Sequence, residues 1–323
     1  MTGAALPDPV AELRPLDLRI MGGPNYWALR PLARLDLAIG AYEDISTADV
    51  PGTRERLLAA LPPLAEHECS VGERGGFAMR MEEGTYAPHV IEHTALALQE
   101  LAGQDVGLGR ARDGMAPREY VIVVAFQHAT VGRCSLALAL GLVQRAFTGT
   151  LTPDDARAAA AELRTLADAP ERPEDRLPPT PALAWAGVTG GDAAARAATV
   201  RALREAGCSD AVDVAPGVLL ADGLPYRRAR MAVVLDAELH EGVAEPYRDR
   251  DRAERLVTTL VDALAPDGVA IVPADDAALV AHAEERARKH PMRVLTFDGV
   301  DALAVRLRDA VALTRGVASL EVT

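Results

Sequence analysis

Residues 166–184 read LADAPERPEDRLPPTPALA, and this stretch divides the sequence into two halves. It holds five prolines among charged residues. Proline lacks a backbone N–H donor and breaks the periodicity of helices and strands, so the stretch is predicted to be an interdomain linker. The predicted organisation is a first domain over residues 1–165, a linker over 166–181 and a second domain over 182–323.

The half before the linker alternates predicted strands and helices, which are assigned from the spacing of apolar residues. The predicted strands are LDLRIMG (16–22), LARLDLAIG (32–40), GGFAMRM (75–81) and REYVIVVAFQ (118–127). The predicted helices cover 52–68, with an interruption near Pro62, and 88–102, 132–147 and 153–169. These elements predict a small domain of α+β or α/β type.

The half after the linker alternates in the same way. Its predicted strands are ALAWAGVTG (182–190), RMAVVLDA (230–237), GVAIVPA (268–274) and RVLTF (293–297), and its predicted helices cover 193–206, 251–265, 276–289 and 300–314. Strands that alternate with helices predict a parallel sheet. The whole chain is therefore predicted to belong to the α/β class.

Composition limits the class of function. Hydrophobic residues make up 49% of the 323 residues and charged residues 25%, as in soluble globular proteins. The net charge of −13 argues against a nucleic-acid partner, because phosphate binding needs a basic face. No run of 18 uncharged apolar residues and no signal peptide is found, so no membrane partner is expected. Three widely spaced cysteines favour a reducing, cytoplasmic location.

The predicted helix over 88–102 carries His89, Glu92 and His93 in the order H-x-x-E-H. At 100° per residue the three side chains share one face, opposite the apolar face. Histidines at i and i+4 can bind one Zn²⁺, and a glutamate beside the second can take a proton from a water. The alternative is a solvated polar face. A third ligand is left open, and the candidates are Glu82, Glu83 and the cluster Glu66, His67, Glu68 and Cys69.

Three stretches together give the first half a family resemblance. These stretches are GGPNYWALR, LPPLAEHECS and GGFAMRMEEGTYAPHVIEHTALALQELAGQDVGLGRAR. They resemble the N-terminal domain of cyanophycin synthetase, and the resemblance extends over residues 18–165. The resemblance implies contact with cyanophycin, a poly-aspartate that carries arginine on its β-carboxylates. In some members it also implies a metal-dependent hydrolase that cuts this polymer.

The resemblance also implies roles for particular residues. It places the metal centre on His89, Glu92 and His93, with Glu83 in the matching E-G-T stretch. This chain departs from the family at Ala97. The family reads ALELQ, with a glutamate at this position, whereas residues 95–99 here read ALALQ. The positive side chains expected to meet polymer carboxylates are those of Arg80 and Arg110, with Arg112.

The second half resembles the Mur-ligase-like domain of the same synthetases, over residues 182 to about 300, with the ATP-grasp domain missing between the halves. A working phosphate loop would read G-x-T-G-T-N-G-K-T-T, whereas residues 187–196 read GVTGGDAAAR. Gly190 and Gly191 remain, but Ala194 and Ala195 replace the phosphate-binding lysine and the Mg²⁺-binding hydroxyl. No ATP is therefore expected, and the domain is interpreted as kept for packing or assembly.

The function predicted from these features is a zinc-dependent hydrolase that cuts cyanophycin or a related β-aspartyl-arginine polymer. Glu92 is its predicted general base, and His89, His93 and Glu83 are its predicted metal ligands. The alternative is a non-catalytic homologue that binds the polymer or a synthetase as scaffold or regulator. The apolar stretch 134–147 is interpreted as core, with a homo-oligomer contact left open.

Overall fold

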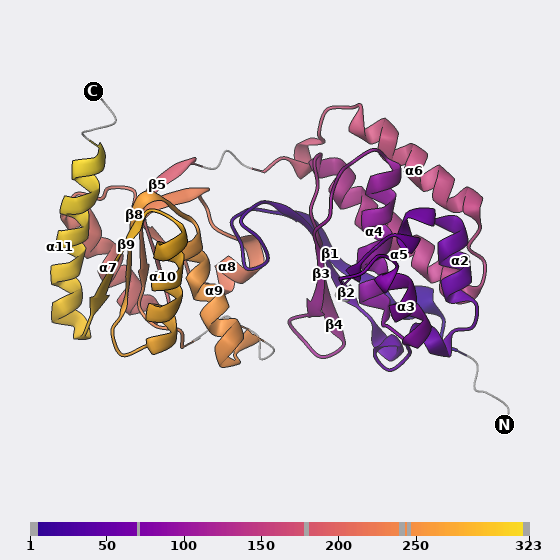
Figure 1. Ribbon diagram of the computed structural model, residues 1–323, viewed down its shortest axis with the longest axis horizontal. Coiled ribbons are helices and arrows are strands. Elements are labelled where there is room, and N and C mark those ends of the chain that lie inside the picture. Colours follow the sequence, from indigo (N-terminus) through magenta and orange to yellow (C-terminus); the bar gives the residue numbers. More distant parts are fainter. Residues whose placement is uncertain (1–5, 70–71, 178–180, 239–242, 244–246, 319–323) are drawn as a thin grey trace. The chain divides into compact units, whose positions relative to one another are not determined.

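The structure is a computed structural model that describes residues 6–69, 72–177, 181–238, 243 and 247–318. It divides into two units (Figure 1). The first unit comprises Met1–Ile20 and Leu32–Leu177, and the second comprises Met21–Pro31 and Pro178–Thr323. The first holds a four-stranded sheet and the second a five-stranded sheet, so the predicted α/β class is confirmed.

The sheet of the first unit has the strand order β1-β2-β4-β3. Its strands are β1 (Arg14–Met21), β2 (Leu32–Ala38), β3 (Gly109–Asp113) and β4 (Glu119–Val124). The central strand β4 pairs antiparallel with both β2 and β3. The sequence analysis anticipated β1, β2 and β4 but not β3, because GRARD carries too few apolar residues to read as a strand.

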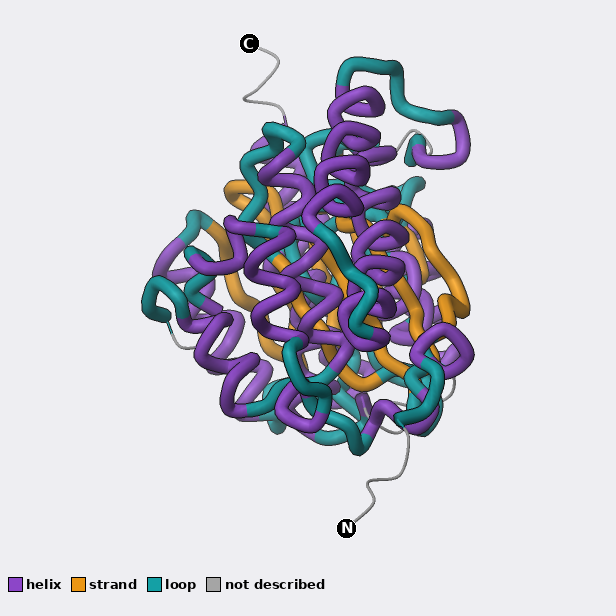
Figure 2. The backbone as a smooth tube through the Cα atoms, turned by 90° about the vertical axis from the view of Figure 1, so that its right-hand side faces the viewer, coloured by secondary structure: helices purple, strands orange, loops and turns teal. Residues whose placement is uncertain are grey.

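Helices pack with this sheet into one core (Figure 2). They are α1 (Pro9–Glu12), α2 (Thr53–Ala60), α3 (Gly76–Glu83), α4 (Ala87–Leu101), α5 (Ala129–Thr148) and α6 (Pro153–Ala167), with 3-10 turns at Gly40–Glu43, Thr47–Asp49, Pro62–Ala65 and Pro173–Asp175. Local signals fix the ends of several of them. Thr152 and Asp155 form a capping box at the start of α6, and Gly149 ends α5 in the left-handed conformation. The predicted helices over 88–102, 132–147 and 153–169 are confirmed as α4, α5 and α6.

The prediction of a strand over GGFAMRM is wrong, because residues 76–83 form helix α3. Phe77, Met79 and Met81 alternate as in a strand, but Phe77 and Met81 are also four residues apart, which puts them on one helix face. Both are buried, whereas Met79 is exposed. Gly75, with a φ of +83°, makes the turn that starts this helix.

The sheet of the second unit has the order β6-β5-β7-β8-β9, and every strand pair in it is parallel, as predicted. Its strands are β5 (Leu183–Thr189), β6 (Val212–Asp213), β7 (Arg228–Val234), β8 (Leu264–Pro273) and β9 (Met292–Phe297). Its helices are α7 (Ala193–Glu205), α8 (Pro216–Asp222), α9 (Arg250–Asp262), α10 (Ala277–Lys289) and α11 (Gly299–Ala318). Successive residues of β7 point to opposite faces of the sheet and enter two different cores. Met231 and Val233 pack with α7 and α11, whereas Ala232 and Val234 pack with α8, α9 and α10.

The segment Met21–Pro31 is part of the second unit, although it lies between β1 and β2 in the sequence. Tyr26 packs edge-on against Tyr247 with ring centroids 5.6 Å apart. The backbone N–H of Leu224 donates to the carbonyl of Pro24 at 2.7 Å. The sequence analysis contained no sign of this excursion, since GGPNYWALR has no periodic pattern.

Limited trypsin digestion is expected to cut after Arg176, which is exposed, just before the second unit resumes. The preceding residues are held, because Arg133 pairs with the buried Asp175 and the N–H of Arg172 donates to Thr130. The two fragments should still co-elute in native gel filtration and separate in urea, since the first carries segment 21–31 of the second unit. Fragments that separate without denaturant would contradict this arrangement.

Candidate functional site

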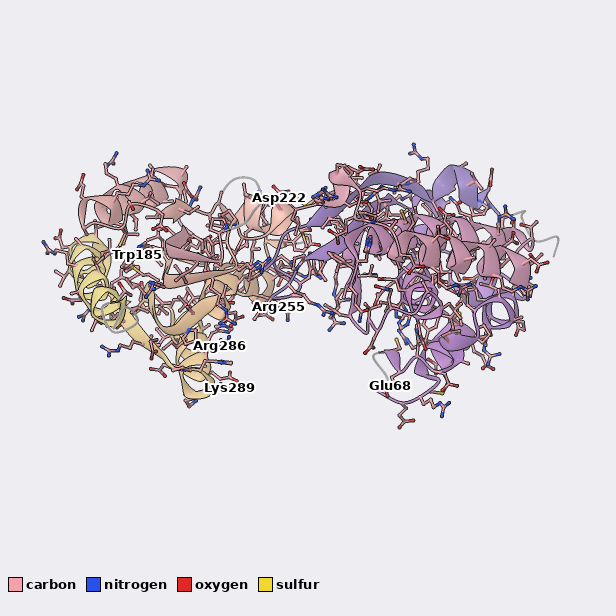
Figure 3. All side chains as sticks on the ribbon, turned by 90° about the horizontal axis from the view of Figure 1, so that it is seen from above. Glu68, Trp185, Asp222, Arg255, Arg286 and Lys289 are labelled. Atoms are coloured by element: carbon pink, nitrogen blue, oxygen red, sulfur yellow. The ribbon has the colours of Figure 1, made fainter. Side chains whose placement is uncertain are left out.

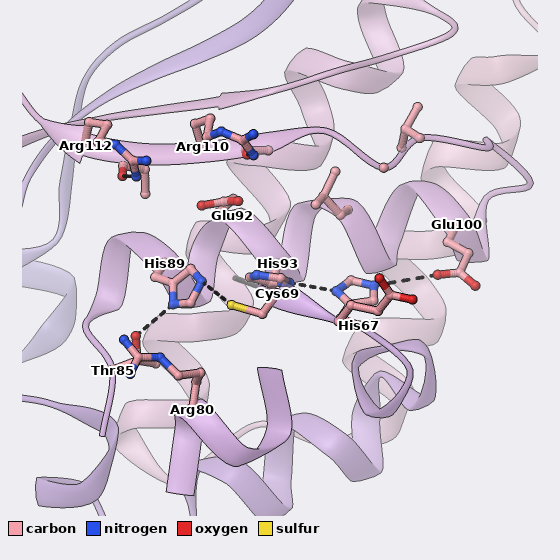
Figure 4. A pocket seen from close by; sticks show the side chains of 16 residues that line it. His67, Cys69, Arg80, Thr85, His89, Glu92, His93, Glu100, Arg110 and Arg112 are labelled. Atoms are coloured by element: carbon pink, nitrogen blue, oxygen red, sulfur yellow. Dashed lines mark hydrogen bonds and ion pairs between the residues drawn. The ribbon is translucent and has the colours of Figure 1, made fainter. Parts of the chain in front are cut away.

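A cavity of about 840 Å³ opens in the first unit beside helix α4 (Figure 4). The helix contributes His89, Glu92 and His93 to its wall, and strand β3 contributes Arg110 and Arg112. The remaining polar side chains come from the segments around α3 and from the end of α4: His67, Glu68, Cys69, Arg80, Thr85 and Glu100. The polar face of the helix therefore lines this cavity.

Three potential metal ligands converge in this cavity. One donor atom each of Cys69, His89 and His93 lies within 4.8 Å of the other two. The thiol Sγ of Cys69 is 3.2 Å from Nε2 of His89. The backbone of Cys69 has a φ of +56°, a conformation that is strained for a residue with a side chain. Strain of this kind is typical of positions where a fold holds a side chain for a purpose.

Each histidine is held in place by a second polar group. Oγ1 of Thr85 lies 2.8 Å from Nδ1 of His89, which leaves Nε2 of that ring facing Cys69. Nδ1 of His67 lies 2.9 Å from Nδ1 of His93, and Glu100 lies 3.7 Å from the other nitrogen of His67. Outer contacts of this type fix the ring orientation of metal-binding histidines.

Both histidines are held neutral. Burial lowers the pKa of His89 to about 4, with a further contribution from the positive charges of Arg80 and Arg112. Burial also lowers the pKa of His93 far below its usual value, assisted by its neighbours His89 and His67. A neutral imidazole keeps the lone pair that a metal needs.

Glu92 is a buried carboxyl group on the β3 side of the helix, with only 8% of the residue exposed. Burial raises the pKa of Glu92 to about 7, and the positive charges of Arg110 and Arg112 and the backbone N–H of Ala111 partly oppose that rise. The absence of a side chain at Gly109 leaves room for the carboxyl group of Glu92, since a Cβ at residue 109 would stand 2.7 Å from Oε1 of Glu92. A carboxyl group with a pKa near neutrality can both accept and return a proton.

The structure brings together only some of the residues singled out from the sequence. Arg80 and Arg110 line the cavity with the two histidines and Glu92. Glu83 does not line it: its side chain is 68% exposed at the end of α3, and its carboxylate lies 3.8 Å from Arg80. Ala97 is fully buried in the core. Among the open candidates for a third ligand, Cys69 has a donor atom within 4.8 Å of both histidine donors, and His67 contacts His93 at 2.9 Å.

Glu68 also lines the cavity, whereas Glu66 and Glu82 have partners elsewhere. Glu66 pairs with Arg74, and Glu82 lies 3.8 Å from Arg54. Thr85 and Phe77 were not anticipated from the sequence. Phe77 stacks on the ring of His93 at 4.0 Å between centroids, and its only sequence signal is the apolar spacing that was read as a strand.

The loop interpreted from the sequence as a degenerate phosphate loop joins β5 to α7, and carboxylates accept from two of its backbone N–H groups. The N–H of Gly191 donates to Asp236, and the N–H of Ala195 donates to Asp192. Nη1 of Arg196 donates to the carbonyl of Gly191 at 2.8 Å. Two carboxylates thus stand where a phosphate would need donors, and the side chains of Ala194 and Ala195 supply none.

We expect Mg²⁺-ATP to give no protection from hydrogen exchange at residues 189–196, because these donors are already satisfied by carboxylates. Exchange followed by mass spectrometry with and without the nucleotide measures this for the loop alone. Slower exchange of the loop peptide at saturating nucleotide would show that the loop still binds phosphate.

None of the helices in the described residues combines the length and apolar character of a bilayer-spanning segment.

Comparison with known proteins finds that part of the first unit is similar to a known domain family. Residues 34–148 match the cyanophycin synthase-like N-terminal domain. Over 136 residues the chain is 42% identical to the cyanophycin synthetase of Trichormus variabilis, a stretch that covers 41% of this chain and 15% of that protein. It is 44% identical over 128 residues to the cyanophycin synthetase of Synechocystis sp., covering 38% of this chain and 14% of that protein.

The first unit therefore contains a cyanophycin synthase-like N-terminal domain, and the resemblance noted in the sequence is confirmed for this part of the chain. The matched stretch includes most of β2 and all of β3, β4, α4 and α5, together with every residue of the cavity wall named above. The chain spans about 15% of the length of these curated relatives.

Proposed function

We propose that the cavity of the first unit is a metal-dependent hydrolase centre that cuts cyanophycin or a related β-aspartyl-arginine polymer. The observation that carries this proposal is the convergence of Cys69, His89 and His93 in a cavity that also holds the buried Glu92. The match of the domain to cyanophycin synthetases supports the choice of polymer.

The three side chains fit a zinc ion. Ligands of a tetrahedral Zn²⁺ stand roughly 3.5 Å apart, because Zn–N and Zn–S bonds are about 2.0 and 2.3 Å long. Sγ of Cys69 and Nε2 of His89 are already 3.2 Å apart. Cysteine and histidine are the ligands that zinc prefers, and three protein ligands leave a fourth position open. Zn²⁺ bound there would act as a Lewis acid toward a carbonyl oxygen.

The residues of the chain supply the remaining functions. Thr85 and His67 orient the two histidine rings through contacts of 2.8 and 2.9 Å. Glu92, buried and with a pKa near neutrality, accepts a proton from water and returns it to the leaving nitrogen.

The lining of the cavity suits a polymer that carries both charges. Arg80, Arg110 and Arg112 present guanidinium groups, which bind carboxylates in a bidentate manner. Glu68 and Glu100 present carboxylates, which accept hydrogen bonds from guanidinium groups. A β-aspartyl-arginine unit offers one carboxylate and one guanidinium, so the two sets of side chains can hold it in one orientation.

The proposal is tested by loading the full chain with Zn²⁺, removing excess metal and incubating it with insoluble cyanophycin. Release of soluble oligomers, measured by chromatography, is the expected result. A chain that holds one equivalent of Zn²⁺ and releases no soluble product would contradict the hydrolase proposal.

A second candidate is a non-catalytic polymer-binding protein. The observation that favours it is Ala97, which is buried in the core where the resembled family has a glutamate. Under this alternative the arginines of the cavity bind the polymer and no bond is cut. Co-sedimentation of the chain with cyanophycin, without soluble products, is the result that this alternative predicts.

A further inference from the structure

The second unit contains a pocket of about 420 Å³ whose wall includes four arginines. Arg30, Arg227, Arg228 and Arg286 all line it, and Asp262 is its one acidic residue. Such a concentration of positive charge stands out in a chain with a net charge of −13. We propose that this pocket is a binding site for a small multiply charged anion that presents several carboxylate or phosphate oxygens.

The arginines come from parts of the sequence that are far apart. Arg30 belongs to the segment Met21–Pro31, Arg227 and Arg228 stand at the start of β7, and Arg286 projects from the last turn of α10 (Figure 3). The fold, and not a basic run in the sequence, brings the four charges to one pocket. Their repulsion opposes folding unless an anion offsets it.

The charges of three of these arginines are not neutralised by the protein. Among the described residues, Arg30, Arg227 and Arg228 make no ion pair with a carboxylate. The carboxylate of Asp262 is shared between Arg286, at 3.7 Å, and His282, at 3.1 Å. The pocket therefore holds an excess of guanidinium groups that are available to a ligand, and guanidinium binds carboxylate and phosphate in a bidentate manner.

The segment that presents Arg30 is held rigidly. The side chain of Asn25, only 2% exposed, donates to the carbonyls of Gly22 and Arg30 and accepts from the N–H groups of Trp27 and Ala28. Gly23 lies so close to Arg30 that a Cβ would stand 2.1 Å from the carbonyl carbon of that residue. A preorganised loop loses little conformational entropy when a ligand binds, which favours affinity.

The pocket is distinct from the degenerate phosphate loop. Arg228 is the first residue of β7 and Ala263 directly precedes β8, so the pocket lies at the amino ends of the parallel strands. The loop with Gly190 and Gly191 follows β5 at the carboxyl ends. The two features occupy opposite edges of one sheet, and binding at one is separable from binding at the other.

The test uses isothermal titration calorimetry of the full chain with two probes, citrate for carboxylates and inorganic tripolyphosphate for phosphates. Saturable binding of at least one probe is expected, and it should weaken as ionic strength rises. The probe that binds more tightly identifies the oxygen chemistry of the ligand.

Two variants assign that binding to the pocket. Arg30→Ala combined with Arg227→Ala should lower the affinity by about tenfold for each arginine removed, since charge-assisted hydrogen bonds to the anion are lost. Arg308→Ala, at an exposed position of α11 outside the pocket, is the matched control and should bind as the unchanged chain does. The proposal is overturned if neither probe binds saturably, or if the double variant binds as tightly as the control.

Discussion

Replacing His93 by alanine is expected to abolish Zn²⁺ retention and polymer hydrolysis together. The imidazole of His93 is one of three donors within 4.8 Å of one another, and two donors hold zinc weakly. Metal content after dialysis, measured by mass spectrometry, and release of soluble oligomers give the two readings. His290→Ala, at an exposed histidine after α10, is the control and should change neither.

Glu92→Gln should separate the two readings, since it keeps the three donors and removes the proton acceptor. Metal content should stay at one equivalent, while hydrolysis should fall by about 10²- to 10⁴-fold, the usual contribution of a general base. If Glu92→Gln hydrolyses the polymer at the rate of the unchanged chain, the role of this carboxyl group is wrong.

Cys69→Ala and Glu83→Gln distinguish the two candidates for the third ligand. Cys69 lies 3.2 Å from His89, whereas Glu83 is exposed beside Arg80. We expect Cys69→Ala to lose zinc and Glu83→Gln to retain it. Loss of zinc in Glu83→Gln alone would restore the ligand set that the family resemblance implied.

Phe77→Ala is expected to destabilise the first unit by about 3–5 kcal/mol, because it removes a fully buried aromatic ring. It should also weaken zinc binding by about tenfold, since the ring stacks on His93 at 4.0 Å and fixes its plane. Urea denaturation and zinc titration against a chelator measure the two effects.

Phe147→Ala is the matched control for this experiment. Phe147 is also buried in the first unit, but it stacks on Tyr42 at 5.2 Å and does not touch the cavity. It should cost a similar free energy of unfolding and leave the zinc affinity unchanged. Equal zinc affinities in the two variants would show that Phe77 has no part in positioning His93.

The sequence predicted the helix and its polar face because both depend on local spacing. His89, Glu92 and His93 recur at intervals that only an α-helix places on one side, and α4 has that geometry. What covers this face could not be predicted, because Cys69 and His67 reach it from a segment before α3, through tertiary packing. Glu83 was named as a ligand because the family resemblance placed it there, and the structure leaves it exposed beside Arg80.

The parallel sheet of the second unit was predictable for a similar reason. Its strands are short apolar runs between helices, and the runs of β5, β7 and β8 become largely buried strands. The short strand β6 and helix α8 were missed, because two and seven residues give too little pattern to detect. The docking of segment 21–31 rests on contacts with residues about 200 positions away, which no local pattern encodes.

Because residues 21–31 pack in the second unit, they must wait during synthesis for the residues that they contact. This segment leaves the ribosome early, but the residues that receive it, such as Leu224 and Tyr247, are made much later. At usual elongation rates the nascent chain waits about 10 s or more with Tyr26 and Trp27 uncovered. The second unit can close only after its last strand has left the ribosome, so segment 21–31 cannot dock until then.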